Sequence, residues 1–262
     1  VTSWGTDHDG KVRLAFTTDG VNTSIQHRRN EDDEFKTIAN TTFRETLIPQ
    51  FFSFDNQYLF ALSNIGRDKL SAIEFDLEKG AETKVLFEHK EVDLDSVHFS
   101  RKRKVVSDCL FTTWKSERVY FDEEAKGIYE YLESQLPDCN VVLESMNVDE
   151  NKFTVRTYSD RSLGAYYYFD ATTQQLSLLA NVSPWLNESE LAHTRPIKYL
   201  SRDGHTIHGY LTQPPGKEKN LPVVVNPHGG PWHRDVWGFN PEVQFLANRG
   251  YAVLQINFRG ST

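Results

Sequence analysis

Residues 221–235, LPVVVNPHGGPWHRD, combine an apolar run with residue types that could do chemistry. The three valines predict a buried strand, and the segment after them contains His228, the pair Gly229 and Gly230, and then His233. Glycine lets a ligand approach the main chain closely, and proline stiffens the loop that carries it. A stiff loop of this kind can present backbone N–H groups to the negative oxygen that forms during acyl transfer. We therefore interpret Gly229 and Gly230 as candidates for an oxyanion-binding loop.

The elements on either side of this loop must position it. Residues 239–250 predict a helix, with Asn240 as its N-cap, Pro241 in its first turn and Gly250 at its end. Residues 251–258, YAVLQINF, predict a second buried strand, so strand, loop, helix and strand form a parallel βαβ unit. α/β-Hydrolases carry an oxyanion donor in such a loop, often as His-Gly-Gly-Gly. A plain Gly-Gly-Pro turn is the alternative.

Three charged or titratable residues near the loop invite other interpretations. His228 and His233 lie five residues apart with no third ligand in view, which matches no usual zinc spacing, so we expect no metal and no cofactor. We expect His228 to fix the loop by hydrogen bonding and His233 to lie at the surface or in a cleft. Arg259 is interpreted as a buried structural arginine, with a substrate contact as the alternative.

Residues 1–186 show short alternating runs separated by turn residues. Phe54, Phe99 and Val148 occupy matching places just before polar turns and lie 45 and 49 residues apart. A period of about 40–50 residues with four short strands per unit is typical of β-propeller blades. We expect about four blades, the first of them incomplete, and an irregular β-sandwich is the alternative.

One segment departs from the strand pattern. Ile128, Tyr131, Leu132 and Leu136 recur at helical spacing, which predicts a helical insertion near residues 122–136 in one of the blades.

The pattern changes again near residues 183–199, and Asp203-Gly204 between alternating runs predicts a β-hairpin just beyond. We therefore predict a partial β-propeller over residues 1–186. Residues 187–262 then form a linker and the N-terminal part of an α/β-hydrolase catalytic domain. The predicted fold class is β-propeller blades, all-β and partial, followed by the beginning of an α/β-hydrolase domain.

Composition limits the function classes. The net charge of −8 argues against a nucleic-acid partner, and no apolar run approaches the roughly 18 residues of a membrane span. Cys109 and Cys139 are too few for a disulfide framework. The chain begins at Val1 and its single methionine is internal, so we expect an internal piece of a longer protein. The compartment stays open between cytoplasm and periplasm.

Three stretches together carry a resemblance to a known family. PVVVNPHGGP (222–231) and WGFNPEVQFLANRGYAVLQINFRGST (237–262) resemble the start of the catalytic domain of the prolyl oligopeptidase family of serine peptidases. RPIKYLSRDGHTIHGYLTQP (195–214) resembles that family's entry into the domain. The resemblance implies a Ser-Asp-His triad, acyl-enzyme chemistry and a propeller that restricts access to oligopeptides. By analogy with the branch that resembles acylaminoacyl peptidases, the N–H of Gly230 would complete the oxyanion hole.

Two features of the family pattern are missing. The tyrosine of the prolyl endopeptidase and dipeptidyl peptidase branches has no match in NPHGGP, which argues against those two specificities. The nucleophile motif Gly-x-Ser-x-Gly occurs nowhere, and α/β-hydrolase triads follow the order serine, acid, histidine. We therefore expect the whole triad beyond Thr262 and this chain alone to be inactive. A peptide is the expected partner and an oligomer stays open. An esterase of the same fold and a non-catalytic propeller scaffold are the alternatives.

Overall fold

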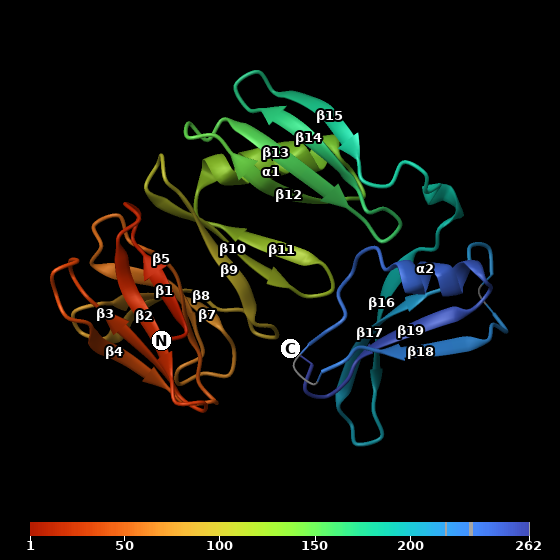
Figure 1. Cartoon of the computed structure of the whole chain (residues 1–262). Helices are drawn as coiled ribbons and strands as arrows, with labels where there is room; N and C mark the ends of the chain where they lie inside the picture. The colour runs from red at the N-terminus through yellow and green to blue at the C-terminus, as the bar shows by residue number, and fades with distance from the viewer. Residues whose placement is uncertain (218, 231–232, 262) are drawn as a thin grey trace. The chain divides into compact units, whose positions relative to one another are not determined.

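The computed structural model describes residues 1–217, 219–230 and 233–261. The chain divides into two compact units, Val1–Glu123 and Glu124–Thr262. Figure 1 labels the strands and helices of the chain. Strands dominate both units, and the described residues contain nineteen strands and two α-helices. The domain boundary at residue 187, which the change of sequence pattern predicts, stays a prediction.

The first unit consists of antiparallel sheets in which each strand pairs with the next strand in the chain. Its strands are β1 (Ser3–Thr6), β2 (Val12–Thr18), β3 (Thr23–His27), β4 (Lys36–Thr41), β5 (Leu47–Phe52), β6 (Tyr58–Ser63), β7 (Ser71–Asp76), β8 (Ala81–Phe87), β9 (Leu94–Ser100), β10 (Val105–Thr112) and β11 (Ser116–Tyr120). They form the sheets β1–β4, β5–β8 and β9–β11. The expectation of an incomplete first blade is wrong, because the first sheet has four strands and the third sheet has three. β1 escapes sequence analysis because it is only four residues long and largely exposed.

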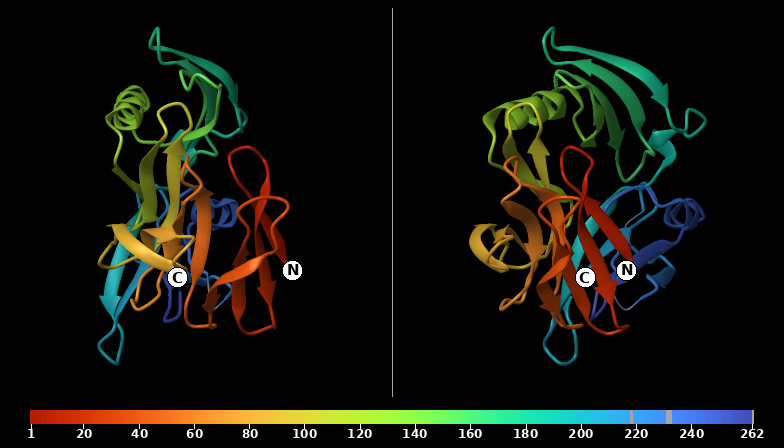
Figure 2. Two further views of the ribbon diagram at one scale, coloured as in Figure 1. Left: turned by 90° about the vertical axis from the view of Figure 1, so that its left-hand side faces the viewer. Right: turned by 60° about the vertical axis from the view of Figure 1, so that its left-hand side comes forward.

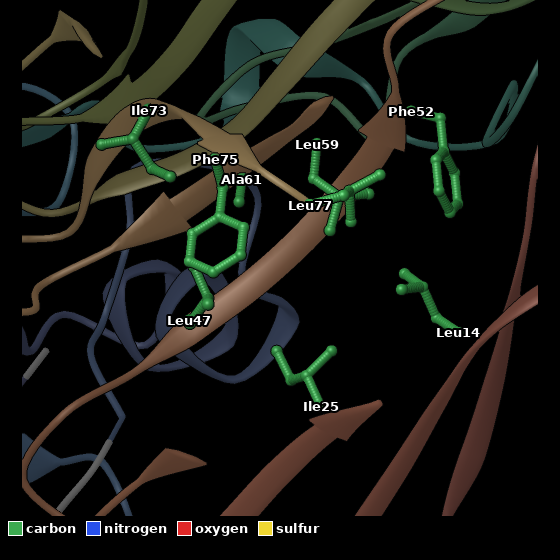
Figure 3. Packing of buried hydrophobic residues seen from close by; sticks show 9 residues of the cluster. All are labelled: Leu14, Ile25, Leu47, Phe52, Leu59, Ala61, Ile73, Phe75 and Leu77. Atoms are coloured by element: carbon green, nitrogen blue, oxygen red, sulfur yellow. The ribbon is translucent and has the colours of Figure 1, made fainter. Parts of the chain in front are cut away.

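Both faces of the central strands β6 and β7 of the sheet β5–β8 are buried, which explains their largely apolar sequences. One face joins β2 and β3 in a cluster that Figure 3 shows: Leu14, Ile25, Leu47, Phe52, Leu59, Ala61, Ile73, Phe75 and Leu77. The other face joins β9 and β10 in a second cluster: Phe51, Leu62, Ala72, Leu94, Val97, Cys109 and Phe111. Successive side chains such as Ala61 and Leu62 enter different clusters because a strand alternates its faces. The antiparallel sheets confirm the all-β part of the predicted fold class.

The repeat positions Phe54 and Phe99 meet in space within the first unit. The ring of His8 stacks on Phe54 with ring centroids 4.3 Å apart. The ring of Phe99 meets the same His8 ring edge-on, with centroids 5.2 Å apart. His8 follows β1 as Phe54 follows β5, so it occupies the corresponding place in the first sheet. Sequence analysis misses His8 because its residue type differs from the repeat. The third repeat position, Val148, belongs to the second unit and is 92% exposed.

The second unit begins with a helix packed on an antiparallel sheet. The helix is α1 (Glu123–Gln135), and the sheet contains β12 (Asn140–Met146), β13 (Lys152–Tyr158), β14 (Ala165–Asp170) and β15 (Gln175–Asn181). Tyr131 of α1 stacks on Phe169 of β14 at 5.4 Å, and its hydroxyl donates to the carbonyl of Gln174 at 2.7 Å. Leu132 is fully buried. Figure 2 shows α1 beside this sheet, at the place where the sequence predicts a helix.

A mixed sheet completes the unit. Its strands are β16 (Thr194–Leu200), β17 (Thr206–Thr212), β18 (Val223–Pro227) and β19 (Ala252–Asn257), in the order β16-β17-β19-β18. β16 and β17 form the predicted hairpin, with Gly204 at φ +83° in its turn. β18 and β19 pair in parallel, and α2 (Pro241–Asn248) lies in the connection between them. The side chain of Asn240 accepts from the N–H groups of Glu242 and Val243, as expected of an N-cap.

A buried side-chain amide of α2 bonds to the segments that follow β13 and η1. Gln244 of α2 is 4% exposed, and its Nε2 donates to the carbonyls of Asp160 and Ala192 at 2.8 and 2.7 Å. Its Oε1 accepts from the N–H of Ala192 at 2.9 Å. Ala192 lies just after the short 3-10 helix η1 (Glu188–Glu190), and Asp160 follows β13. Because a buried amide with all its partners strongly favours one arrangement, these contacts fix the segments around Asp160 and Ala192 against α2 within the second unit.

Candidate functional site

The loop that contains Gly229 and Gly230 begins at the carboxyl end of β18. The parallel register pairs Pro227 with Ile256, so this loop starts at the same edge of the sheet as the segment that follows β19. Ligands of open α/β sheets bind at the carboxyl ends of the strands. Pro231 and Trp232, which belong to the same predicted loop, lie outside the described residues.

His228 fixes the start of the loop by hydrogen bonding, as expected. Its Nδ1 lies 2.7 Å from the carbonyl oxygen of Gly229, which can only accept, so Nδ1 carries the proton. Its Nε2 then accepts from the hydroxyl of Ser261 at 2.7 Å. The ring also stacks on Phe258, with centroids 4.4 Å apart. His228 therefore joins the loop to the segment after β19.

Asn257 of β19 fixes the loop at Asp235. The N–H of Asp235 donates to Oδ1 of Asn257 at 2.8 Å, and Nδ2 of Asn257 donates to the carbonyl of Asp235 at 3.0 Å. One carboxamide thus satisfies both backbone groups of Asp235, as a neighbouring strand would. The same side of β19 provides Gln255, whose Nε2 donates to Oδ1 of Asp235 at 2.8 Å.

The carboxyl group of Asp235 is partly buried and bonded to Gln255. Its Oδ2 is buried without a hydrogen-bond partner among the described residues, and Gln255 is 5% exposed. Burial raises the pKa of Asp235 above its usual range, although the hydrogen bond from Gln255 and the charges of His228 and His233 lower it. Asp235 is therefore an anchored residue of this loop, and its carboxyl group has a raised pKa.

The backbone at Gly229 does not itself require glycine. Its φ lies outside the left-handed region, and no atom of the described residues lies within 4 Å of the place where a Cβ would sit. Gly230 is exposed. A side chain at Gly229 would fill open space beside the main chain, which is the space a ligand needs for close approach.

The remaining residues singled out by sequence behave differently from one another. His233 is exposed, which is one of its two expected positions. Arg259 is not buried: its side chain is 69% exposed and pairs with Asp203 in the β16–β17 turn. In the described part of the chain, no group of three or more His, Cys, Asp or Glu residues could hold a metal ion. No helix in residues 1–217, 219–230 and 233–261 is long and apolar enough to cross a membrane.

Sequence analysis misses the residues that anchor the loop, namely Asp235, Gln255 and Asn257. One signal was present, because Gln255 and Asn257 are polar residues at alternate positions of an otherwise apolar strand. Such a pair indicates that side chains on one face of the strand make hydrogen bonds. Its partner could not be identified, because Asp235 lies 20 and 22 residues away in sequence.

The chain is similar in sequence to known peptidases. Dipeptidyl aminopeptidase BIII of Pseudoxanthomonas mexicana is 29% identical over 249 residues, which cover 90% of this chain and 35% of that protein. Dipeptidyl peptidase family member 6 of Caenorhabditis elegans is 25% identical over 288 residues, with 98% and 39% covered. The acylamino-acid-releasing enzyme of Rattus norvegicus is 38% identical over 66 residues, with 25% and 9% covered. The homologues of this chain are prolyl oligopeptidase family members.

Solved structures of prolyl oligopeptidase relatives have the same fold. A prolyl endopeptidase structure superposes with a TM-score of 0.71 at 17% identity, covering 97% of this chain and 37% of its own. Puromycin hydrolase superposes with a TM-score of 0.69 at 16% identity, covering 98% and 41%. The antiparallel sheets match the propeller domain of these structures. The chain spans less than half the length of each of these relatives. No protein-family model matches it.

Proposed function

We propose that this chain is part of a serine peptidase that hydrolyses oligopeptides through an acyl-enzyme. The observation that carries the proposal is the glycine loop at the carboxyl end of β18, in a chain whose homologues along 90% of its length are peptidases. On this proposal β16–β19 and α2 begin an α/β-hydrolase domain, and the propeller-like sheets restrict access to peptide-sized substrates. Both dipeptidyl and acylaminoacyl names occur among the relatives, and NPHGGP supports the acylaminoacyl-like branch.

The proposed task of the loop is to stabilise the transition state. Attack on a peptide carbonyl places negative charge on its oxygen, and a fixed N–H donor stabilises that charge without having to reorganise. Gly230 supplies the donor, and the open space at Gly229 lets the substrate approach the main chain. His228 and Asn257 hold the loop at two points, so that the donor stays in place. We propose that the nucleophile, base and acid lie outside this chain, because Gly-x-Ser-x-Gly is absent from its 262 residues.

The test replaces Gly230 in a longer form of the protein that contains the nucleophile. Gly230→Val crowds the loop and displaces the N–H from the developing oxyanion. We expect kcat to fall by about 10²–10³-fold with KM nearly unchanged, because the lost interaction belongs to the transition state. Steady-state kinetics with a chromogenic acyl-peptide measures both constants.

Gly250→Ala is the matched control. Gly250 has φ +95°, and no described atom lies within 4 Å of the point that a Cβ would occupy, so alanine there strains the end of α2 without touching the loop. It should lower the melting temperature and leave kcat of the folded protein unchanged. A folded Gly230→Val variant with normal kcat would show that the loop is a plain turn.

A further inference from the structure

A serine, a histidine and an aspartate form a hydrogen-bonded chain on the sheet β9–β11. Ser96 and His98 are two residues apart on β9 and so lie on the same face of the strand. Asp108 of β10 is the cross-strand partner of His98. The three side chains therefore meet because of the antiparallel register, although ten residues separate His98 from Asp108.

The distances assign a role to each ring nitrogen of His98. Nδ1 lies 2.8 Å from Oδ2 of Asp108, which only accepts, and 3.3 Å from Nη1 of Arg118, which only donates. The shorter contact, to the carboxylate, assigns the proton of the neutral imidazole to Nδ1. Nε2 then accepts from the hydroxyl of Ser96 at 3.1 Å. This order of nucleophile, base and orienting carboxylate is the one that activates serine in triads, which are recognised by geometry rather than by sequence position.

Asp108 is held so that it can orient the imidazole. Its side chain is 4% exposed, pairs with Arg118 and accepts from the hydroxyl of Ser107 at 2.8 Å. Burial raises its pKa, but the hydrogen bond from His98 and the charge of Arg118 outweigh this and hold the pKa below its usual range. The carboxylate is therefore ionised at neutral pH and fixes the tautomer of His98.

The Ser96 end of this hydrogen-bonded series is accessible to solvent. The side chain of His98 is 42% exposed and Ser96 is partly exposed, whereas Ser107 is 7% exposed. Ser107 bonds to the same carboxylate from the buried side. Ser107 thus bonds to Asp108 directly, whereas Ser96 is linked to it through the imidazole of His98 and is more accessible to solvent.

We propose that Ser96 is an activated nucleophile and a site of covalent modification by acyl or phosphonyl electrophiles that carry good leaving groups. With a fluorophosphonate, the Ser96 Oγ–P bond forms as the P–F bond breaks, and fluoride departs with the electron pair. The hydroxyl proton passes to Nε2 of His98 and then to buffer. Peptide turnover is not expected here, because an amine leaving group needs a stabilised oxyanion and a bound substrate.

The test treats the 262-residue chain with a fluorophosphonate and locates the adduct by peptide mass spectrometry. We expect one phosphonyl group per chain at Ser96. His98→Gln should slow the labelling by about 10²-fold, the low end of the usual contribution of general-base catalysis. Ser96→Ala should abolish it. The result bears on this site alone, because the serine of the proposed peptidase lies outside the chain.

Ser116→Ala is the matched control, since it removes an exposed serine hydroxyl from β11 of the same sheet and should leave labelling of Ser96 intact. Circular dichroism confirms that each variant folds. If His98→Gln does not fold, the ratio of labelling at Ser96 to labelling at Ser107 in the wild-type protein tests the proposal, which requires Ser96 to be labelled faster. Equal labelling of the two serines, labelling spread over unrelated side chains, or an unchanged rate in folded His98→Gln would each overturn the proposal.

Discussion

At the scale of single residues, the loop after β18 depends on Asn257, whose carboxamide binds the main chain of Asp235 through a donor and an acceptor. This side chain belongs to a strand, so its position is set by the sheet and not by the loop. The backbone of Asp235 is therefore held by a rigid element. Because one side chain provides this anchor, a substitution of Asn257 should destabilise the loop.

Asn257→Leu should release this anchor. Leucine has a similar size but leaves two backbone groups of Asp235 without partners, which costs about 1–3 kcal/mol. We expect that loss in the free energy of unfolding, together with faster hydrogen exchange at the Asp235 amide. Gln255→Leu is the control, because the side chain of Gln255 donates to the carboxyl group of Asp235 and not to its backbone, so its loss should leave that amide protected. Unchanged exchange in Asn257→Leu would contradict the assignment.

His27 at the end of β3 makes stability depend on pH. Burial lowers its pKa from 6.5 to about 4, and the charges of Arg13 and Arg29 add to this, whereas Asp33 opposes it. The unfolded chain takes up a proton near pH 6.5, but the folded chain takes it up only near pH 4. Between these values the unfolded state binds more protons, so stability falls as pH drops from about 6.5 to about 4.

We predict that the melting temperature falls as the pH is lowered through this window, and that it falls less steeply in the His27→Gln variant. Asp7, whose pKa is lowered from 3.8, loses its contribution mainly below the window and does so in both wild type and variant, so it does not affect the comparison. Thermal melts at half-unit steps of pH measure both slopes. Identical slopes in wild type and variant would show that His27 does not cause the effect.

At the scale of elements, the turn between β13 and β14 depends on Gly164. Its φ is +86°, and an added Cβ would lie 1.6 Å from the carbonyl oxygen of Thr157. Gly204 in the β16–β17 turn has a similar φ of +83°, but a Cβ there would have no described atom within 4 Å. The two glycines therefore separate backbone strain from steric conflict within one compact unit.

Gly164→Ala should destabilise the chain by at least about 3 kcal/mol, because left-handed strain of about 1–2 kcal/mol adds to an overlap that only backbone movement can relieve. Gly204→Ala should cost only the strain, about 1–2 kcal/mol. Urea unfolding followed by circular dichroism gives both values. Equal costs would mean that the turn at Gly164 relaxes freely.

Local signals explain which elements could be predicted. The ends of α2 followed from Asn240, Pro241 and Gly250, since caps act within one turn of the helix. The β16–β17 hairpin followed from Asp203-Gly204 for the same reason. The anchors of the loop could not be predicted, because they join residues that only the sheet brings together. The roles of Gly229 and Gly230 stay predictions.

At the scale of the whole chain, sequence pattern and packing divide the molecule by different criteria. The pattern changes near residue 187, where strand repeats give way to a βαβ unit. Packing separates Val1–Glu123 from Glu124–Thr262, and within the second of these units the buried amide of Gln244 binds the segments around Asp160 and Ala192 to α2. Periodicity in a sequence predicts local elements. A buried polar contact between residues far apart in sequence produces no periodic pattern, so it cannot be predicted in the same way.

The same scale decides what the chain can do alone. An oxyanion donor without a nucleophile lowers no barrier to acyl-enzyme formation, and the 262 residues contain no Gly-x-Ser-x-Gly. We therefore expect no turnover of a chromogenic acyl-peptide by the purified chain, and turnover by a longer form that carries the nucleophile. Release of at most one chromophore per chain would reflect modification of Ser96. Multiple turnover with saturation kinetics in the 262-residue chain would show that the peptidase nucleophile lies within it.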